Sequence, residues 1–315
     1  MPAPARRPTP APVRAGSRRE RSRPPEPARQ DMTSTPARRA RRHHIGEFVA
    51  SGDWSDYWST AISRAGQGRI LVRGYPVEEV IERLNHTEVA YLVLRGELPD
   101  ARQTALFDLV LRCGVDQQFV SAAVGAARFT ASAFPDSPIP ALASGLLASG
   151  SVTGSPQEPA QMLIEAVAWQ LPEAEAVARV MQLWGERRGR VPGLGHPMHK
   201  TAEPRAVTLR RLALELDGWR AHGRMLDAVE AHLAAAKGRK IPINLAGALG
   251  AVLADLGFEP LVIGGLGALG YGMALLAHIS EEIHDGVPLR IIPDALGAHY
   301  DGPEERHIPP RRTGA

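Results

Sequence analysis

The sequence RRGRVPGLGHPMHK occupies residues 187–200, and Glu-Pro-Arg follows at residues 203–205. The stretch opens with arginines, continues as a glycine- and proline-rich loop, and then reaches His196, with Arg205 a short way beyond. A glycine-rich backbone can approach a ligand closely. Arginines beside exposed backbone N–H groups suit phosphate, and an arginine fork suits a carboxylate. The stretch therefore indicates a site for a phosphorylated cofactor and an acidic substrate, with an ordinary connecting loop as the alternative.

Three further stretches lie around this one: RGYPVEE at residues 73–79, AYLVLRGELP at residues 90–99 and YDGPEER at residues 300–306. Together with the loop, they resemble signature motifs of the citrate synthase family. Those motifs read RGYP(I/V)EEL, AYLLLxGELP, Gly-Phe-Gly-His leading to Lys and Asp-Pro-Arg, and YxGPExR. Because four matches occur in the family's own order, the resemblance is specific.

The resemblance implies an all-α fold with two domains that close over the substrates. The large domain would combine residues 45–117 and 251–315, and the small domain, residues 118–250, would carry the CoA and substrate loop. The residues themselves favour the helical class, because apolar positions recur at helical spacing between capping residues. The pattern predicts a strand at residues 69–73 and helices near residues 76–84, 85–96, 100–113, 117–127, 139–149, 157–171, 173–187, 203–217, 222–237, 242–256 and 259–284.

Family chemistry is a Claisen condensation, in which acetyl-CoA becomes an enol that attacks the carbonyl of oxaloacetate. Citryl-CoA lyases of the same superfamily run the carbon–carbon step in reverse. The resemblance thus implies a CoA thioester as substrate with no permanently bound cofactor. It also implies a di- or tricarboxylate ligand, and a homodimer or a heteromer with a paralogue.

Site residues follow from the resemblance position by position. His196 matches the histidine that polarises the ketone, and Arg205 matches a carboxylate-binding arginine, although Glu203 replaces the usual aspartate. Gln117 falls where a catalytic histidine stabilises the enol, and its amide can still donate a hydrogen bond. The positions implied for CoA are Arg188, Arg190, Val191, Gly193, Gly195 and Lys200.

Other positions depart from the family pattern. Ala246 falls where the catalytic aspartate base should be, and Tyr271 and Ile292 replace two arginines. If the match to the family motifs were shifted by one or two residues, Asp116 or Asp255 would instead act as the base. Otherwise Asp255 is expected to be an ordinary exposed residue between helices.

Two functions are compatible with this pattern. Because loss of a well-placed base costs roughly two to four powers of ten in rate, we expect an enzyme of citrate synthase or citryl-CoA lyase type with altered or reduced activity. Cleavage would begin with removal of the citryl hydroxyl proton, for which His196 is placed, so lyase chemistry tolerates the missing aspartate better. The alternative is a non-catalytic paralogue that binds CoA or a carboxylate as a regulatory or heteromeric partner.

The composition of residues 1–44 and the net charge limit which partners and which cellular location are expected. Residues 1–44 carry 12 arginines, three acidic residues and many prolines, which predicts a disordered basic extension. Subtracting its net charge of +9 from the whole-chain +3 leaves the remainder near −6. Nucleic-acid binding would rest on the basic extension alone and is not favoured over a solvated extension. No apolar segment follows the basic start, and Cys113 is the sole cysteine. We therefore expect a cytoplasmic protein.

The sequence favours neither a metal site nor a membrane span. His196 and His199 are three residues apart, but no further cluster of ligands accompanies them. Residues 245–279 are apolar and unusually rich in glycine. This composition favours a buried core helix or a dimer interface over a membrane span. Glu281 and Glu282 are expected at a solvated helix end.

Overall fold

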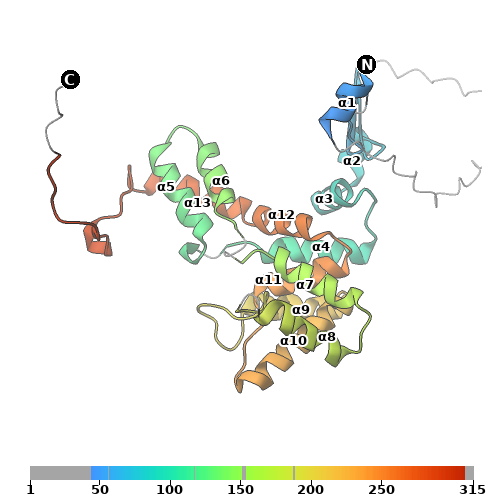
Figure 1. The fold of residues 1–315 in the computed structure, drawn as a ribbon. Coiled ribbons are helices and arrows are strands. Elements are labelled where there is room, and N and C mark those ends of the chain that lie inside the picture. Colours follow the sequence, from blue (N-terminus) through green and yellow to red (C-terminus); the bar gives the residue numbers. More distant parts are fainter. Residues whose placement is uncertain (1–43, 56, 117, 151–153, 187–188, 309–315) are drawn as a thin grey trace, which may run out of the picture. The chain divides into compact units, whose positions relative to one another are not determined.

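The computed structural model describes residues 44–308 except residues 56, 117, 151–153 and 187–188. It is mostly helical, which confirms the predicted all-α class (Figure 1). The chain divides into two compact units, residues 1–59 and residues 60–315. The predicted disordered extension, residues 1–44, lies outside the described residues apart from His44.

The described part of the first unit holds one helix and an aromatic cluster. Helix α1 spans Ile45–Ser51 and ends at Gly52, whose φ of 64° suits glycine. Phe48 lies in the helix and contacts the rings of Trp54 and Tyr57 at centroid distances of 5.9 and 5.2 Å. These ring contacts hold the segment after α1 against the helix.

A small antiparallel sheet opens the second unit. Its strands are β1 (Ser63–Gly66), β2 (Arg69–Val72) and β3 (Tyr75–Pro76), in the order β1-β2-β3. Strand β2 confirms the strand predicted at residues 69–73. Strand β1 is exposed throughout and β3 has only two residues, so neither shows an alternating pattern. Gly68 and Gly74, at φ of 69° and 90°, permit the tight turns between the strands.

Helices make up most of the second unit, and local capping explains several of their ends. Asn85 and Asp100 each begin a helix with a capping box, formed with Glu88 and Gln103 respectively. The helices are α2 (Val77–Arg83), α3 (His86–Arg95), α4 (Ala101–Cys113), α5 (Ala122–Ala133), α6 (Pro138–Leu147), α7 (Gln157–Ala168), α8 (Glu173–Val180), α9 (Pro204–Glu215), α10 (Ala221–Lys237), α11 (Leu245–Asp255), α12 (Pro260–Gly270) and α13 (Gly272–Asp285). Short 3₁₀ turns occur at Gln118–Val120 and Asp294–Leu296, and α8 continues as a π-helical turn, Met181–Glu186. The single helix predicted at residues 259–284 is two helices, separated at Tyr271.

Helix α11 lies at the centre of the main apolar core. Ten of its 11 residues are buried, and it packs against α4, α7, α9, α10 and α12 (Figure 1). A second apolar core joins α5, α6 and α13. The main core draws helices from both predicted domains. The boundaries predicted at residues 117/118 and 250/251 stay a prediction.

The helix end at Glu282 is buried, so the prediction of a solvated end is wrong for this residue. Its side chain is 0% exposed and accepts hydrogen bonds from Arg128 Nε at 2.6 Å and Arg290 Nη2 at 2.9 Å. Glu281 does face solvent, at 59% exposure, and its carboxylate pairs with Arg128 at 3.0 Å. The carboxylate of Glu282 thus links α5, α13 and the segment that follows α13.

The apolar segment Pro260–Asp285, comprising α12, Tyr271 and α13, is long and apolar enough to cross a membrane. Only 11% of its most apolar window is buried within the chain, whereas α11 is almost wholly buried. The prediction of a buried core helix therefore holds for α11, and the alternative of a dimer interface stays a prediction for Pro260–Asp285. Its glycines do permit close packing: a Cβ at Gly264 would lie 2.6 Å from Gln157 Oε1 at the start of α7. Exposed apolar residues on this segment include Leu261, Leu269 and Met273.

Candidate active site

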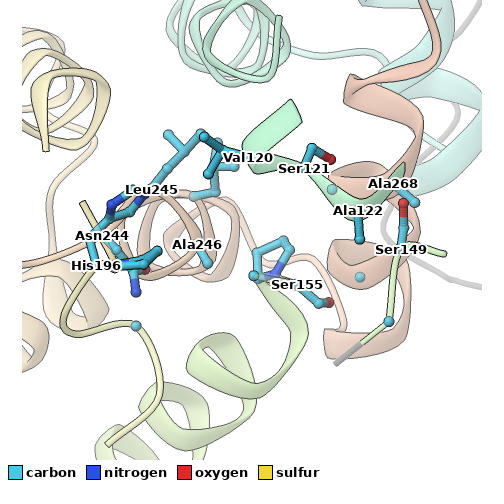
Figure 2. Close-up of a pocket in the computed structure, with 18 of the residues that line it drawn as sticks. Val120, Ser121, Ala122, Ser149, Ser155, His196, Asn244, Leu245, Ala246 and Ala268 are labelled. Atoms are coloured by element: carbon cyan, nitrogen blue, oxygen red, sulfur yellow. The ribbon is translucent and has the colours of Figure 1, made fainter. Parts of the chain in front are cut away.

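A cavity of about 360 Å³ lies among the segments that contain the predicted site residues. Among the described residues, six segments line it: the start of α5, the loop between α6 and α7, the loop at residues 190–197, the start of α9, the first two turns of α11 and one face of α12. Figure 2 shows its labelled residues, including His196, Ala246, Ser155 and Ala268, which come from four of these segments.

The loop at residues 190–197 is held against the start of α11 by hydrogen bonds. Gly195 N donates to Pro242 O at 2.7 Å, and Asn244 N donates to Gly193 O at 3.0 Å. The Asn244 amide also donates to Gly195 O at 2.8 Å while its oxygen caps α11. One side chain therefore fixes both the helix start and the loop that leads to His196.

Two glycines allow this contact. Gly193 has φ of 83°, and a Cβ added there would lie 2.8 Å from the Cα of Gly247 in the first turn of α11. A Cβ at Gly247 would in turn contact the Gly193 carbonyl oxygen closer than atoms can approach. The backbones of loop and helix thus meet directly, which only glycine permits on both sides.

His196 lines the cavity as a hydrogen-bond donor. Its Nδ1 accepts the backbone N–H groups of Met198 and His199, each at 3.1 Å. Burial, with a smaller contribution from His199, lowers the pKa of His196 below its ordinary value of 6.5. The ring is therefore neutral near pH 7 with its proton on Nε2. Because Nδ1 accepts two backbone N–H groups, Nε2 is the nitrogen left for a substrate, and the expectation that His196 removes a hydroxyl proton stays a prediction.

Arg205 lines the same cavity at the start of α9. Its Nε donates to Glu203 Oε1 at 2.8 Å, and Glu203 Oε2 accepts the Ala206 N–H at 2.7 Å as the N-cap of α9. Glu203 is only 1% exposed. The glutamate that replaces the usual aspartate therefore still orients the arginine and caps its helix.

Ala246 lines the cavity in the first turn of α11, at the position expected for the base. Among the described lining residues there is no aspartate or glutamate. Asp116 instead accepts a hydrogen bond from His278 Nε2 at 3.1 Å, outside the cavity lining. Neither this residue nor Asp255 takes the place of the missing base within the described part of the chain.

Asp255 has a structural task, so the expectation of an ordinary exposed residue is wrong. Its side chain is 4% exposed and accepts hydrogen bonds from the backbone of Arg220, His222 and Gly223 at the start of α10. The His222 ring lies 2.8 Å away as a further partner. Backbone hydrogen bonds of this kind stabilise a helix start.

The cavity brings together many of the predicted positions and omits others. Arg190, Val191, Gly193 and Gly195 line it, as does Tyr271. Lys200 does not line it, and its ammonium donates to the His196 carbonyl at 3.3 Å. The predicted residues Gln117 and Arg188 lie outside the described residues, so their predicted roles stay predictions.

Some lining residues were missed by sequence reasoning. Three serines, Ser121, Ser149 and Ser155, bring hydroxyl groups to the cavity, and Asn244 holds its wall. The glycine- and serine-rich composition at residues 148–155 is the signal that indicates a loop near a ligand. Among the described residues no cluster of three potential metal ligands occurs, and the absence of a metal from the chemistry stays a prediction.

Comparison with known proteins identifies the family. The family "Citrate synthase, C-terminal domain" matches residues 100–292, which is more than half of the chain. The chain belongs to the citrate synthase family. The family match therefore covers α4 to α13 and the cavity they surround.

Individual proteins are similar to the chain in sequence or in fold. The citryl-CoA lyase of Hydrogenobacter thermophilus is 26% identical, with a TM-score of 0.74 over 80% of this chain and 97% of that one. The ATP citrate lyase of Methanothrix soehngenii, solved with citrate and coenzyme A, is 21% identical with a TM-score of 0.65, and the likeness covers 46% of that chain. Peroxisomal citrate synthase 1 of Arabidopsis thaliana is 44% identical over 45 residues, which span 9% of its length.

Proposed function

We propose that this protein makes or breaks a carbon–carbon bond between a CoA thioester and an oxo acid, in the manner of citryl-CoA lyases and citrate synthases, at a reduced rate. The observation that carries the proposal is the cavity in which the His196 Nε2–H group and the Arg205 guanidinium occur together. The likeness to citryl-CoA lyase, which covers 97% of that enzyme, supports the cleavage direction.

The residues of the cavity suit part of this chemistry. A neutral His196 that donates through Nε2 can stabilise negative charge on the oxygen of a ketone or of the corresponding alkoxide. Arg205 can hold a carboxylate of the oxo acid. Arg190 and the backbone of the 190–197 loop suit the phosphates of CoA, which would act as a substrate and not as a permanently bound cofactor.

The proton-transfer step has no carboxylate among the described lining residues. Loss of a positioned general base costs typically 10²- to 10⁴-fold in rate. This absence is the specific observation in favour of a second candidate function, a non-catalytic paralogue that binds CoA or a carboxylate as a regulatory or heteromeric partner. We place either protein in the cytoplasm and propose a dimer, homomeric if the protein is an enzyme.

The decisive experiment restores the carboxylate. Free thiol release from acetyl-CoA with oxaloacetate, and separately the consumption of citryl-CoA, are measured for the full chain, Ala246→Asp and the matched control Ala246→Asn. We expect slow turnover by the unmodified protein and a 10²- to 10⁴-fold increase in Ala246→Asp alone.

Each other outcome has a definite meaning. Absence of turnover in the unmodified protein, with turnover in Ala246→Asp, would favour the non-catalytic paralogue. Equal stimulation by Ala246→Asn would show that the carboxylate is not acting as a base. Absence of turnover in all three proteins, with no CoA bound, would overturn both functions.

A further inference from the structure

Few of the described residues that line the cavity carry a positive charge. Its described lining residues with basic side chains are Arg190, His196 and Arg205, and none of the described lining residues is a lysine. His196 is neutral in the arrangement described above. The Arg190 side chain is 58% exposed and its guanidinium lies 3.8 Å from Glu158, so this charge faces solvent at the cavity's edge.

Arg205 is therefore the one described cation in the interior of the cavity, with its side chain 22% exposed. Its charge is partly offset by Glu203, whose carboxylate is 2.8 Å from Arg205 Nε and almost fully buried. A guanidinium in this setting can pair with one substrate carboxylate. It cannot neutralise two carboxylates that occupy separate parts of the cavity.

The described residues of the other walls are uncharged. Helix α12 presents Gly264, Gly267, Ala268 and Tyr271 to the cavity, at the spacing of a single helix face. Ala246 and Leu249 of α11 add apolar surface.

Two arginines of the family pattern are replaced in this chain, and one of the two positions lines the cavity. By the sequence count, Tyr271 stands where the family has an arginine. The second position that lost an arginine, Ile292, is 62% exposed and does not line the cavity. A second carboxylate placed among these walls would lose its hydration without gaining a partner charge, which is strongly unfavourable.

We infer that the oxo acid is a monocarboxylate, a 2-oxo acid with a small uncharged substituent such as 2-oxobutanoate, in place of the dicarboxylate oxaloacetate. The inference rests on the proposed function. In condensation, the α carbon of the thioester loses a proton to solvent and bonds to the keto carbon, and the keto oxygen gains a proton. The product is a 3-hydroxy-3-carboxyacyl-CoA with an alkyl substituent, and cleavage is the reverse.

Binding measurements test the inference without requiring turnover. Calorimetric titration of the full chain first measures affinity for CoA. With CoA saturating, it then compares 2-oxobutanoate with freshly dissolved oxaloacetate, since the two acids differ by a methyl group against a carboxylate. We expect 2-oxobutanoate to bind at least about tenfold more tightly.

Variants test the structural cause of this preference. Tyr271→Arg restores a cation and is expected to improve oxaloacetate affinity relative to 2-oxobutanoate by at least about tenfold. Tyr271→Phe, which adds no charge, should keep the original preference. Leu214→Arg adds the same charge on α9 at a residue that is 49% exposed and outside the cavity lining, and should also keep it.

The outcomes separate this inference from the proposed function. Oxaloacetate that binds the unmodified chain as tightly as 2-oxobutanoate, with CoA bound, overturns the monocarboxylate inference alone. Failure to bind CoA and both acids overturns the proposed function as well. If Tyr271→Arg does not fold, the comparison of the two acids on the unmodified chain still decides.

Discussion

At the scale of single residues, His196 is defined by what its ring already bonds. The backbone N–H groups of Met198 and His199 occupy Nδ1, so this nitrogen cannot carry a proton without losing both contacts. The ring is thereby favoured as an Nε2–H donor, which suits stabilisation of a developing alkoxide. Both N–H groups come from the turn that directly follows His196, so no residue from elsewhere in the chain is needed to favour this tautomer.

The protonation state of His196 can be measured directly. Because its pKa is lowered below 6.5, the ring stays neutral as the pH falls through 6.5 and gains a proton only at lower pH. We expect ¹⁵N NMR to show the Nε2–H tautomer near pH 7 and a titration midpoint below 6.5. The signal is assigned by its absence from His196→Gln. A midpoint at or above 6.5, or an Nδ1–H tautomer, would contradict the assignment.

Protonation of His196 should also reduce folding stability at low pH. The unfolded chain binds a proton near pH 6.5 and the folded chain does so only below that value. Stability attributable to this residue is therefore present above the unfolded pKa and declines as the pH falls below it. The same sign governs any activity that requires the neutral ring.

At the scale of elements, the site depends on direct contact between a loop and a helix. Gly193 and Gly247 bring the backbone of the 190–197 loop against the first turn of α11, and Asn244 ties the two together. His196 belongs to the loop and Ala246 belongs to the helix. The contact between loop and helix therefore sets the position of one residue relative to the other.

Replacement of Gly247 tests the contact. We expect Gly247→Ala to lower the free energy of unfolding by about 1–3 kcal/mol and to weaken CoA binding, because the added Cβ would overlap the Gly193 carbonyl oxygen. The matched control is Gly125→Ala in α5, where a Cβ meets nothing within 4 Å. This control should be neutral or stabilising by up to about 1 kcal/mol. Urea unfolding provides the measurement, and equal effects of the two variants would contradict the contact.

The buried carboxylate of Glu282 tests the packing of α5 on α13. Glu282→Gln leaves the guanidinium groups of Arg128 and Arg290 without their charged partner, and we expect a loss of about 3–5 kcal/mol. Glu281→Gln is the control, and should cost at most about 1 kcal/mol because Glu281 is 59% exposed. Urea unfolding at pH 7 distinguishes them, and a similar small loss in both variants would show that the buried pair contributes little.

The same pair predicts a pH dependence. Burial raises the pKa of Glu282, but the hydrogen bonds from Arg290 and Arg128 outweigh burial and hold the pKa below its ordinary value of 4.5. The stabilisation is present above pH 4.5 and declines as the pH falls through the lower folded value. In Glu282→Gln this part of the acid sensitivity should disappear.

At the scale of the whole molecule, α12 and α13 expose several large apolar side chains. Leu261, Leu269 and Met273 are 75%, 64% and 79% exposed, respectively. Apolar surface of this extent on a helical segment is typical of an interface. The proposed dimer would cover it.

The dimer is tested by mass measurement in solution. We expect light scattering to give twice the chain mass of 33.9 kDa for the unmodified protein and a shift toward the monomer for Leu269→Lys with Met273→Lys. The control is Ile81→Lys on α2, which is 74% exposed and lies outside this segment. A monomer at micromolar concentration in the unmodified protein would contradict the dimer.

The sequence alone determined the family, the helical class and the type of several site residues. Motifs and helix caps are local features: Asn85 and Asp100 begin their helices through residues three positions away. His196, Arg205 and the missing carboxylate at Ala246 could therefore be read from the order of the residues. The helical fold and the loop at residues 190–197 were therefore predictable from local sequence.

Only the tertiary structure decided which residues share the cavity and what state they are in. Glu282 meets Arg128 across 154 positions of sequence, and no local pattern distinguishes that buried carboxylate from a solvated one. Tyr271 lines the cavity and Lys200 does not, although both were assigned from motifs. The burial of a side chain and its hydrogen-bond partners depend on segments that are distant in the chain. The charge states of the site residues therefore depend on how the helices pack.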